Sequence, residues 1–320
     1  MPDLYLHAGA PKTGTSFLQM LFARHADRLD EAGILYPRGH MFDEAKAGEI
    51  TSGNGVELAN YLRPNLPHQI ADKEGYIRQF SRILQSARGK HVLFSSEYLI
   101  FPDGPKTAAV AAAAAQYNYT PKYVYLVRDI DQAAFSTYSQ QVKRSGETKS
   151  FGEYIVNWEP LYRHSILNAE KGFGDECIVA YNYEEWRDRL SELFFSEILG
   201  AGFTPDEKVV VNRSLSPKET ELQRLMNAFA PNNVAFATYI SDALMKLERK
   251  REPMVLTRDE AAFLQKKFAP AVEYVNKFVR GRPTVVCSSD VVPERPPVAV
   301  SDFERAMLSI VAKLVGSVTK

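Results

Sequence analysis

Short apolar runs alternate along the chain with longer segments whose apolar residues recur about every three to four positions. The short runs are of strand length and predict buried β-strands. They cover residues 4–8, 91–94, 122–127 and 177–181, with a candidate edge strand at 34–36 and a further extended segment at 209–211. The longer segments predict helices with one apolar face, at 15–31, 74–87, 131–144, 184–199, 218–229, 234–249 and 259–279. Strands that alternate with helices favour an α/β fold, with a parallel sheet and helices on both faces.

The last part of the chain has a different pattern. Residues 282–300 are rich in proline and predict a surface linker. Residues 301–317 predict a terminal amphipathic helix. Its apolar stripe consists of Phe303, Met307, Ile310, Val311 and Leu314. We therefore expect one α/β domain over 1–281, the linker over 282–300, and a helical C-terminal extension over 301–320. The stripe would dock on the same chain or form a homodimer contact.

The composition is that of a globular protein with balanced charge. Of 320 residues, 45% are hydrophobic and 24% are charged, and 39 basic residues match 39 acidic ones. A net charge of zero gives no overall field that would favour nucleic acid or an anionic membrane, so an anionic ligand needs a local basic site. The two cysteines, Cys177 and Cys287, are expected to be ordinary thiols, and they provide no metal cluster.

The sequence shows no signal-peptide pattern. It also lacks an apolar run of about 18 residues, the minimum for a membrane span. We expect a cytoplasmic protein.

A glycine-containing loop separates the first predicted strand from the first predicted helix. It reads Gly9-Ala-Pro-Lys-Thr-Gly-Thr-Ser16. Loop amides and a helix start together form an anion site, because unpaired N–H groups and the helix dipole both favour negative charge. The loop nearly matches the Walker A pattern, but Thr15 stands where that pattern has lysine, and Lys12 lies inside the loop. The displaced lysine suggests an anion other than that of nucleotide triphosphatases, bound without a metal. The alternative is an ordinary glycine turn capped by Thr15 or Ser16.

The stretch from Pro11 to Gln19 resembles the 5′-phosphosulfate loop of sulfotransferases that use 3′-phosphoadenosine-5′-phosphosulfate (PAPS). With His-Ala-Gly-Ala before it, the stretch is most similar to the bacterial carbohydrate-type branch, which is related to the heparan sulfate sulfotransferases. The resemblance implies a P-loop-like fold, PAPS as sulfate donor, adenosine 3′,5′-bisphosphate as product, and no metal. It also implies that Lys12 neutralises the leaving phosphate oxygen. The residues that would hold the phosphosulfate are Pro11, Lys12, Thr13, Gly14, Thr15 and Ser16.

Arg128 directly follows the predicted strand at 122–127, and Ser136 lies in the next predicted helix. A guanidinium at a strand end and a hydroxyl from the following helix can hold a phosphate. From the residues alone, Arg128 could instead pair with Asp129 or Asp131, and Ser136 could face solvent. The segment resembles the 3′-phosphate motif of the same enzymes, which implies that Arg128 and Ser136 bind the 3′-phosphate of the donor.

Two further segments resemble parts of these enzymes. Tyr181-Asn-Tyr-Glu184 is similar to a Tyr-Glu segment, which implies a structural role. Asn212-Arg-Ser-Leu-Ser216 is similar to a late loop that closes over the nucleotide. Arg213 is the candidate ligand contact in that loop, with a solvated arginine as the alternative.

Ligands of parallel sheets bind beyond the carboxyl ends of the strands, where the glycine loop, Glu97 and Arg128 all lie. Glu97 is the expected catalytic base, since a carboxylate can accept the proton of an attacking hydroxyl or amine. The resemblance supports this role, because the heparan-type enzymes use a glutamate near this place. His7 is the competing base, although a histidine inside a strand is more typical of a hydrogen-bonded core residue. For Glu97 the alternative is a helix-start or salt-bridging glutamate.

The expected function is transfer of a sulfuryl group from PAPS to a hydroxyl or amine of a glycan or small-molecule acceptor, by in-line displacement. A P-loop kinase using ATP is one alternative, which a lysine in place of Thr15 and a magnesium-binding aspartate would favour. A non-catalytic nucleotide- or glycan-binding module of the same fold is the other.

Residues 38–55 show no clear period and are expected to form a loop of the acceptor cleft.

Overall fold

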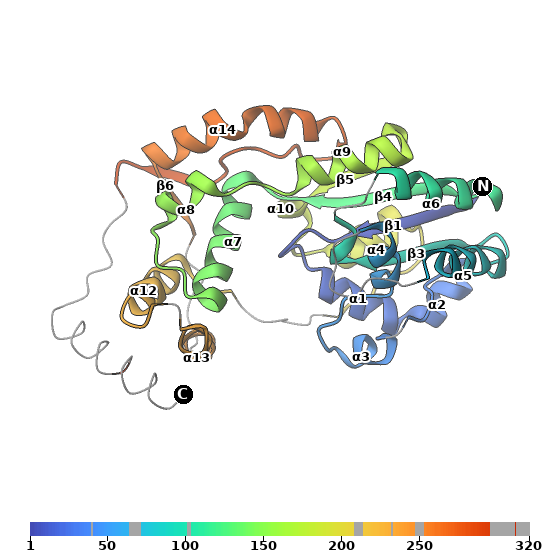
Figure 1. Cartoon of the computed structure of the whole chain (residues 1–320), viewed down its shortest axis with the longest axis horizontal. Helices are drawn as coiled ribbons and strands as arrows, with labels where there is room; N and C mark the ends of the chain where they lie inside the picture. The colour runs from blue at the N-terminus through green and yellow to red at the C-terminus, as the bar shows by residue number, and fades with distance from the viewer. Residues whose placement is uncertain are drawn as a thin grey trace. The chain divides into compact units, whose positions relative to one another are not determined.

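The computed structural model describes residues 1–39, 41–63, 72–100, 104–207, 214–231, 233–246, 253–294 and 311, and Figure 1 shows the path of the chain. The chain forms two compact units. The first consists of Met1–Arg128, Leu161–Val209 and Ala271–Thr284, and the second of Asp129–Pro160, Val210–Pro270 and Val285–Lys320. The chain therefore passes several times between the units, and neither unit is one continuous segment.

The first unit contains a sheet of six strands in the order β2-β3-β1-β4-β5-β7. The strands are β1 (Asp3–Ala8), β2 (Ile34–Leu35), β3 (His91–Ser96), β4 (Thr120–Val127), β5 (Ile178–Asn182) and β7 (Val279–Arg280). All neighbours in this sheet pair in parallel. Ala8 at the end of β1 lies opposite Ser96 of β3 and Tyr125 of β4, so the carboxyl ends of the three central strands lie at one edge.

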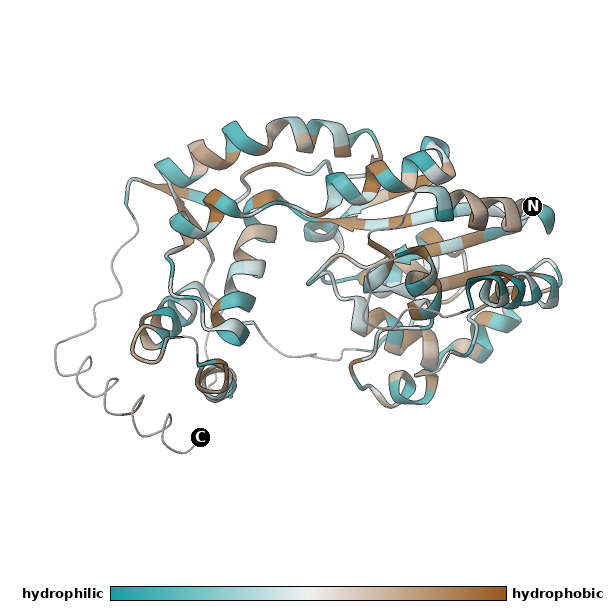
Figure 2. Cartoon of the chain, in the orientation of Figure 1, coloured by the Kyte–Doolittle hydropathy of each residue, from teal (hydrophilic) through white to brown (hydrophobic). Residues whose placement is uncertain are grey.

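Helices cover both faces of this sheet, which confirms the predicted α/β fold class. On one face, α1 (Thr15–Arg24), α2 (Ala26–Glu31) and η3 (Leu193–Ile198) pack on apolar side chains of the central strands. On the other face, α5 (Lys73–Ser86) contacts β3 and α9 (Tyr162–Phe173) contacts β4 through pairs of aromatic rings, and α6 (Gly104–Gln116) packs on both helices. Figure 2 shows hydrophobic colouring along the strands and alternating colours along the helices.

Several short elements complete the first unit, and some depart from the prediction. They are α3 (Phe42–Ala47), α4 (Val56–Leu62), η1 (Glu97–Ile100), η2 (Asp175–Cys177), α10 (Tyr183–Trp186) and α11 (Leu190–Glu192). The helix predicted over 184–199 is divided into α10, α11 and the π-helix η3. The segment 38–55, predicted as a loop, contains α3, which is too short to show a helical period and packs on α1.

The second unit is mainly helical. It contains α7 (Ile130–Ser145), α8 (Phe151–Asn157), α12 (Pro217–Asn227), α13 (Val234–Met245) and a parallel pair of strands, β6 (Val255–Thr257) and β8 (Asp290–Val292). A buried amide joins three of the helices, because Gln223 Nε2 donates to the carbonyls of Val142 and Ala237 at 3.2 and 2.7 Å. Helix α14 (Arg258–Asn276) belongs to the second unit up to Pro270 and to the first unit beyond it.

The structure differs from the expected single domain over 1–281 and linker over 282–300. The carbonyl of Pro283 accepts a hydrogen bond from Asn182 Nδ2 at 3.2 Å, and Thr284 exchanges two hydrogen bonds with Asn276. Strand β8 pairs with β6. Most of the predicted C-terminal helix and the segment 209–211 lie outside the described residues.

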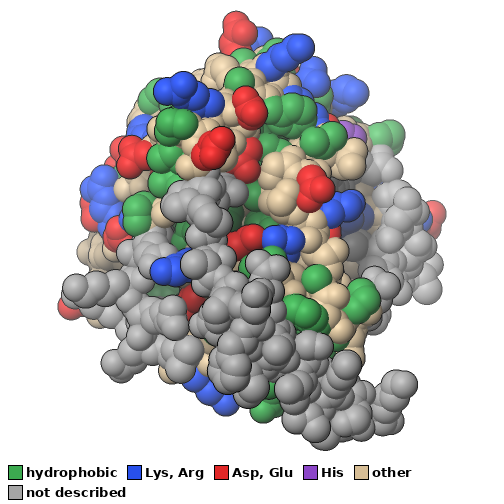
Figure 3. Space-filling view, turned by 90° about the vertical axis from the view of Figure 1, so that its left-hand side faces the viewer, with side chains coloured by type: hydrophobic (Ala, Val, Ile, Leu, Met, Phe, Trp, Pro, Cys, Tyr) green, Lys and Arg blue, Asp and Glu red, His purple; other side chains and the backbone are tan. Residues whose placement is uncertain are grey.

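On the face drawn in Figure 3, Lys and Arg side chains are interspersed with Asp and Glu side chains. Within the described ranges, no helix is both long enough and apolar enough to cross a membrane.

Candidate active site

The loop between β1 and α1 has the geometry of an anion site. Gly14, the residue before α1, has a φ of 75°, and Lys12 has a φ of 63°. The Gly9 amide donates to the carbonyl of Ser96 at 3.3 Å, which joins the start of the loop to β3. The amide of Leu18 donates to the carbonyl of Gly14 at 3.0 Å and so closes the first turn of α1. As at any helix start, the amides before Leu18 have no partner within the helix, and with the helix dipole they favour an anion in the loop.

Two threonine hydroxyls of this loop have different environments. Thr13 is fully buried, and its hydroxyl donates to the carbonyl of Ala10 at 2.7 Å. Thr15 is 9% exposed, and among the described residues its hydroxyl oxygen has no hydrogen-bond partner. This oxygen lies against Gly9, since a Cβ at Gly9 would be only 2.0 Å from it. A buried hydroxyl without a partner is costly, so an oxygen of a ligand in the loop would supply the missing hydrogen bond.

The structure shows no side-chain cap of the kind that the alternative, a glycine turn capped by Thr15 or Ser16, requires. Gly14 occupies the N-cap position of α1, and no side chain caps this helix. Thr15 is already the first helical residue, and Ser16 follows it.

Lys12 joins the loop to the other candidate residues. Its carbonyl accepts a hydrogen bond from Arg128 Nη1 at 3.4 Å, and its charge lowers the pKa of Glu97. Its side chain is exposed, and its positive φ is unusual for a residue with a Cβ. Such backbone conformations persist where the surrounding structure imposes them, and they are frequent at functional sites. The structure thus brings Lys12, Glu97 and Arg128 together, as expected from their shared place at the carboxyl edge of the sheet.

Arg128 is held by an ion pair and an aromatic ring. Its Nε donates to Glu184 Oε1 at 2.8 Å, and the two side chains are only 14% and 13% exposed. Its guanidinium carbon lies 5.0 Å from the centroid of the Tyr183 ring. Because the guanidinium is planar and is fixed in this way, the directions of its remaining N–H groups are fixed as well. Nη1 points toward the loop, where it meets the Lys12 carbonyl.

Glu184 is a site residue to which the sequence assigned only a structural role. It lies two residues beyond β5, at the same sheet edge as Glu97 and Arg128, so the rule that grouped those residues also applied to it. The sequence offered Asp129 and Asp131 as partners of Arg128. In the structure Glu184 pairs with Arg128, while both aspartates accept hydrogen bonds from backbone amides of the second unit.

Glu97 is the first residue of η1 and is exposed. The hydroxyl of Ser96 accepts a hydrogen bond from the Tyr98 amide at 3.2 Å and so stabilises the turn from which Glu97 projects. The surrounding protein displaces water from the carboxyl group and raises the pKa of Glu97, whereas Lys12 lowers it. A carboxylate with a raised pKa is a stronger base than a fully solvated one. Its role as catalytic base stays a prediction.

His7 has the environment of a core residue. It is fully buried, its Nδ1 lies 2.8 Å from Ser95 Oγ, and its ring packs on Phe194 with the centroids 4.6 Å apart. Burial lowers the pKa of His7 to about 3. A neutral, enclosed imidazole is poorly placed to accept a proton from an acceptor substrate, so the geometry favours Glu97 over His7 as the base.

Two of the predicted donor-binding residues are not tested by the structure. Ser136 is half-buried on α7, in the second unit. Arg213 lies outside the described residues. The predicted roles of Ser136 and Arg213 stay predictions.

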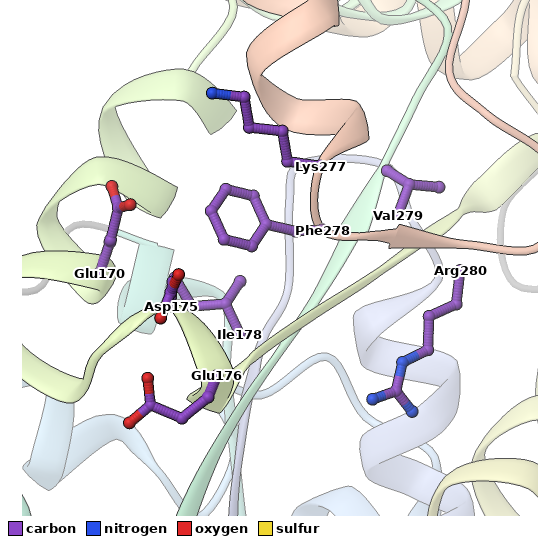
Figure 4. A pocket seen from close by; sticks show the side chains of 8 residues that line it. All are labelled: Glu170, Asp175, Glu176, Ile178, Lys277, Phe278, Val279 and Arg280. Atoms are coloured by element: carbon purple, nitrogen blue, oxygen red, sulfur yellow. The ribbon is translucent and has the colours of Figure 1, made fainter.

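The structure also contains a pocket of about 500 Å³ that shares no residue with this cluster. Its lining residues are Glu170, Asp175, Glu176, Ile178, Lys277, Phe278, Val279 and Arg280 (Figure 4). Ile178 and Val279 are the first residues of β5 and β7, so the pocket lies at the amino edge of the sheet, opposite the glycine loop. Among the residues that the structure describes, no group of three or more His, Cys, Asp or Glu side chains could hold a metal ion.

Comparisons with known proteins give only distant similarities. No family model matches the chain, and no curated protein matches its sequence. A crystal structure of a sulfotransferase from Alicyclobacillus acidocaldarius is 20% identical, with a TM-score of 0.39, over 78% of this chain and 98% of that one. The sulfotransferase domain from the curacin biosynthetic pathway is 12% identical, with a TM-score of 0.29, over 84% of this chain and 98% of that one. Both neighbours are sulfotransferases, but with TM-scores below 0.5 the interpretation of the site depends on its own residues.

Proposed function

We propose that this protein is a PAPS-dependent sulfotransferase that acts on a hydroxyl or amine of a glycan or small-molecule acceptor. The observation that carries this proposal is the meeting of Lys12, Arg128 and Glu97 beside a loop in which the Thr15 hydroxyl is buried without a partner. Lys12, the amides of a helix start and an unpartnered hydroxyl suit an anion with several oxygens, and the neighbouring Arg128 suits a second phosphate group. A carboxylate beside them is suited to accept a proton.

In the proposed reaction, the acceptor oxygen or nitrogen attacks the sulfur in line with the bond that breaks. The proton of the acceptor passes to Glu97. The bond between the sulfur and the phosphate oxygen breaks, and its electron pair stays on the phosphate of the leaving adenosine 3′,5′-bisphosphate. Lys12 and the loop amides would stabilise the charge that develops on this oxygen. Arg128 and Ser136 would bind the 3′-phosphate, and Arg213 would contact the nucleotide from the loop that closes over it.

The first test concerns the nucleotide. Because the lysine of the loop is not in the Walker A position, adenosine 3′,5′-bisphosphate should stabilise the full chain against heat more than ATP does, and a chelator should not weaken this effect. Thermal melting with each nucleotide, with magnesium or with a chelator, measures the difference. Stabilisation by ATP only in the presence of magnesium would support the kinase alternative instead.

The second test concerns the reaction. The full chain is incubated with PAPS and a panel of glycans, phenols and amines, and mass spectrometry is used to find an acceptor that has gained a sulfuryl group. Nucleotide binding without transfer to any acceptor of the panel would support the non-catalytic module.

A further inference from the structure

A short segment, Thr51–Gly55, completes the sheet beside the carboxyl end of β3. Strand β2 pairs only with His91 and Val92, so it leaves the second half of β3 without a strand on that side. The side chain of Asn54 takes this place. Its Nδ2 donates to the carbonyl of Leu93 at 2.9 Å, and its Oδ1 accepts from the amide of Ser95 at 2.8 Å. One side-chain amide thus gives and receives the hydrogen bonds that a neighbouring strand would exchange with β3.

The glycines on either side of Asn54 bring its backbone close to β3. The Gly55 amide donates to the carbonyl of Ser95 at 3.0 Å. A Cβ at Gly53, whose φ is +77°, would be 2.1 Å from the Ser95 carbonyl oxygen. Asn54 Nδ2 also donates to the carbonyl of Pro37 at 3.1 Å, which joins the chain beyond β2 to the same contact. Only a residue without a side chain fits at Gly53, so the segment is built for this close approach.

The carboxyl end of β3, which Asn54 holds by hydrogen bonds, is followed directly by the candidate base Glu97. Ser95 is hydrogen-bonded to Asn54 through its amide, Ser96 caps the turn of η1, and Glu97 follows at once. The position of Glu97 relative to Lys12 therefore depends on how β3 ends. Reacting groups need placement within fractions of an ångström, and such precision comes from the hydrogen bonds that fix their supports.

We propose that Asn54 is a positioning residue for Glu97: it fixes the carboxyl end of β3 so that the Glu97 carboxylate is held beside Lys12 and the glycine loop. The inference rests on the proposed function, in which Glu97 is the base. Asn54 itself does not touch the reacting atoms.

Asn276 provides a matched control. Its side-chain amide makes the same two-way contact with backbone in the same unit, since Nδ2 donates to the Thr284 carbonyl and Oδ1 accepts from the Thr284 amide, both at 2.9 Å. Like Asn54 it is half-buried, and neither of these hydrogen bonds involves a candidate site residue. Asn54 makes one more hydrogen bond, to the Pro37 carbonyl, so Asn54→Ala should cost somewhat more stability than Asn276→Ala, but only Asn54→Ala should affect catalysis.

The experiment compares Asn54→Ala, Asn276→Ala, Glu97→Gln and the double variant Asn54→Ala/Glu97→Gln. Turnover of PAPS with the best acceptor of the panel is measured per site that binds adenosine 3′,5′-bisphosphate, so that unfolded protein is not counted. Asn54→Ala should lower kcat by roughly ten- to a hundredfold, the range for a displacement of about 1 Å, with unchanged nucleotide affinity. Asn276→Ala should leave kcat unchanged. In the Glu97→Gln background, Asn54→Ala should have almost no further effect on kcat, because it acts through Glu97.

Each other outcome contradicts one of the two proposals. If Asn54→Ala matches Asn276→Ala in kcat, or if its effect is undiminished in the Glu97→Gln background, Asn54 does not position Glu97. If Glu97→Gln retains full turnover, the assigned base is wrong, and the inference about Asn54 fails with it. Transfer to no acceptor overturns the proposed function itself.

Discussion

Two opposing influences act on the Glu97 carboxyl group. The surrounding protein displaces water from the carboxyl group and raises the pKa of Glu97, and the Lys12 ammonium lowers it. A base must be ionised to accept a proton, so kcat/KM should fall as the pH drops through the Glu97 pKa. Because the pKa is raised, this fall should lie above the ordinary glutamate value of about 4.3.

Replacing Lys12 should change that pH dependence in a defined direction. Lys12→Gln removes the nearby positive charge, so the pKa of Glu97 should rise further and the acid limb of kcat/KM should move to higher pH, at a lower overall rate. Lys90→Gln is the control, since Lys90 pairs with Asp30 at the amino end of β3. Rate profiles over pH for both variants measure the effect. An acid limb that stays in place in Lys12→Gln would mean that another group titrates.

Arg128 should discriminate between nucleotides. Arg128→Ala should weaken binding of adenosine 3′,5′-bisphosphate by about 1.5–3 kcal/mol, the range for hydrogen bonds to charged groups, and should affect adenosine 5′-phosphate much less. Glu184→Gln keeps the guanidinium but removes its charged partner, so we expect a smaller loss with the same preference. Titration calorimetry with both nucleotides measures these losses. Arg187→Ala, at a surface pair with Asp188, is the control. Equal losses for the two nucleotides would mean that Arg128 does not contact the 3′-phosphate.

At the scale of elements, the arrangement of β1, the glycine loop and α1 depends on the close approach of Gly9 to Thr15. Gly9→Ala would place a Cβ 2.0 Å from the Thr15 hydroxyl oxygen, so the loop must move. Overpacking of this kind costs about 1–3 kcal/mol, and we expect nucleotide affinity to fall by roughly tenfold or more. Gly104→Ala is the matched control, because its Cβ would meet nothing closer than 3.9 Å. Unchanged affinity in Gly9→Ala would show that the nucleotide binds elsewhere.

The elements that could be predicted from sequence are those with a local pattern. β1, β3, β4 and β5 are continuous apolar runs because helices bury both faces of the sheet. The carboxyl ends of these strands lie at one edge of the sheet, and this rule alone predicted that Lys12, Glu97 and Arg128 lie close together. β7 has two residues and produces no pattern. The π-helix η3 interrupts an apolar stripe that otherwise reads as one helix.

The parts of the site that could not be predicted depend on contacts between distant residues. The hydrogen bond between Asn54 and the Ser95 amide joins residues that are 41 positions apart, and the ion pair of Arg128 with Glu184 joins residues that are 56 apart. An asparagine between two glycines reads as an ordinary turn, because nothing in its neighbourhood shows which strand it meets. Glu184 could have been found by applying the strand-end rule to β5 as well.

At the scale of the whole molecule, the chain divides into two interleaved units. Residues 283–292, expected as a linker, provide the hydrogen-bond partners of Asn182 and Asn276 and one strand of the β6–β8 pair. Residues 283 and 284 are therefore an ordered part of the first unit, and β8 is an ordered part of the second.

Truncation tests this difference from the sequence expectation. A chain that ends at Gly281 loses the Pro283 and Thr284 contacts and β8, so it should melt at a clearly lower temperature than the full chain or fail to fold. A chain that ends at Glu294 retains them and should melt at a higher temperature than the shorter one. Thermal melting of the two truncated chains measures the effect. Equal melting temperatures would support the linker over 282–300.

The interleaving also affects how the protein is made. The glycine loop is synthesised long before β7 and Thr284, which complete the sheet that supports it. Until then the edge of β5 that pairs with Phe278 and Val279 has no neighbour and could pair with other chains. Translation therefore separates the glycine loop from its finished support, and the first unit can fold stably only after its last segment has been synthesised.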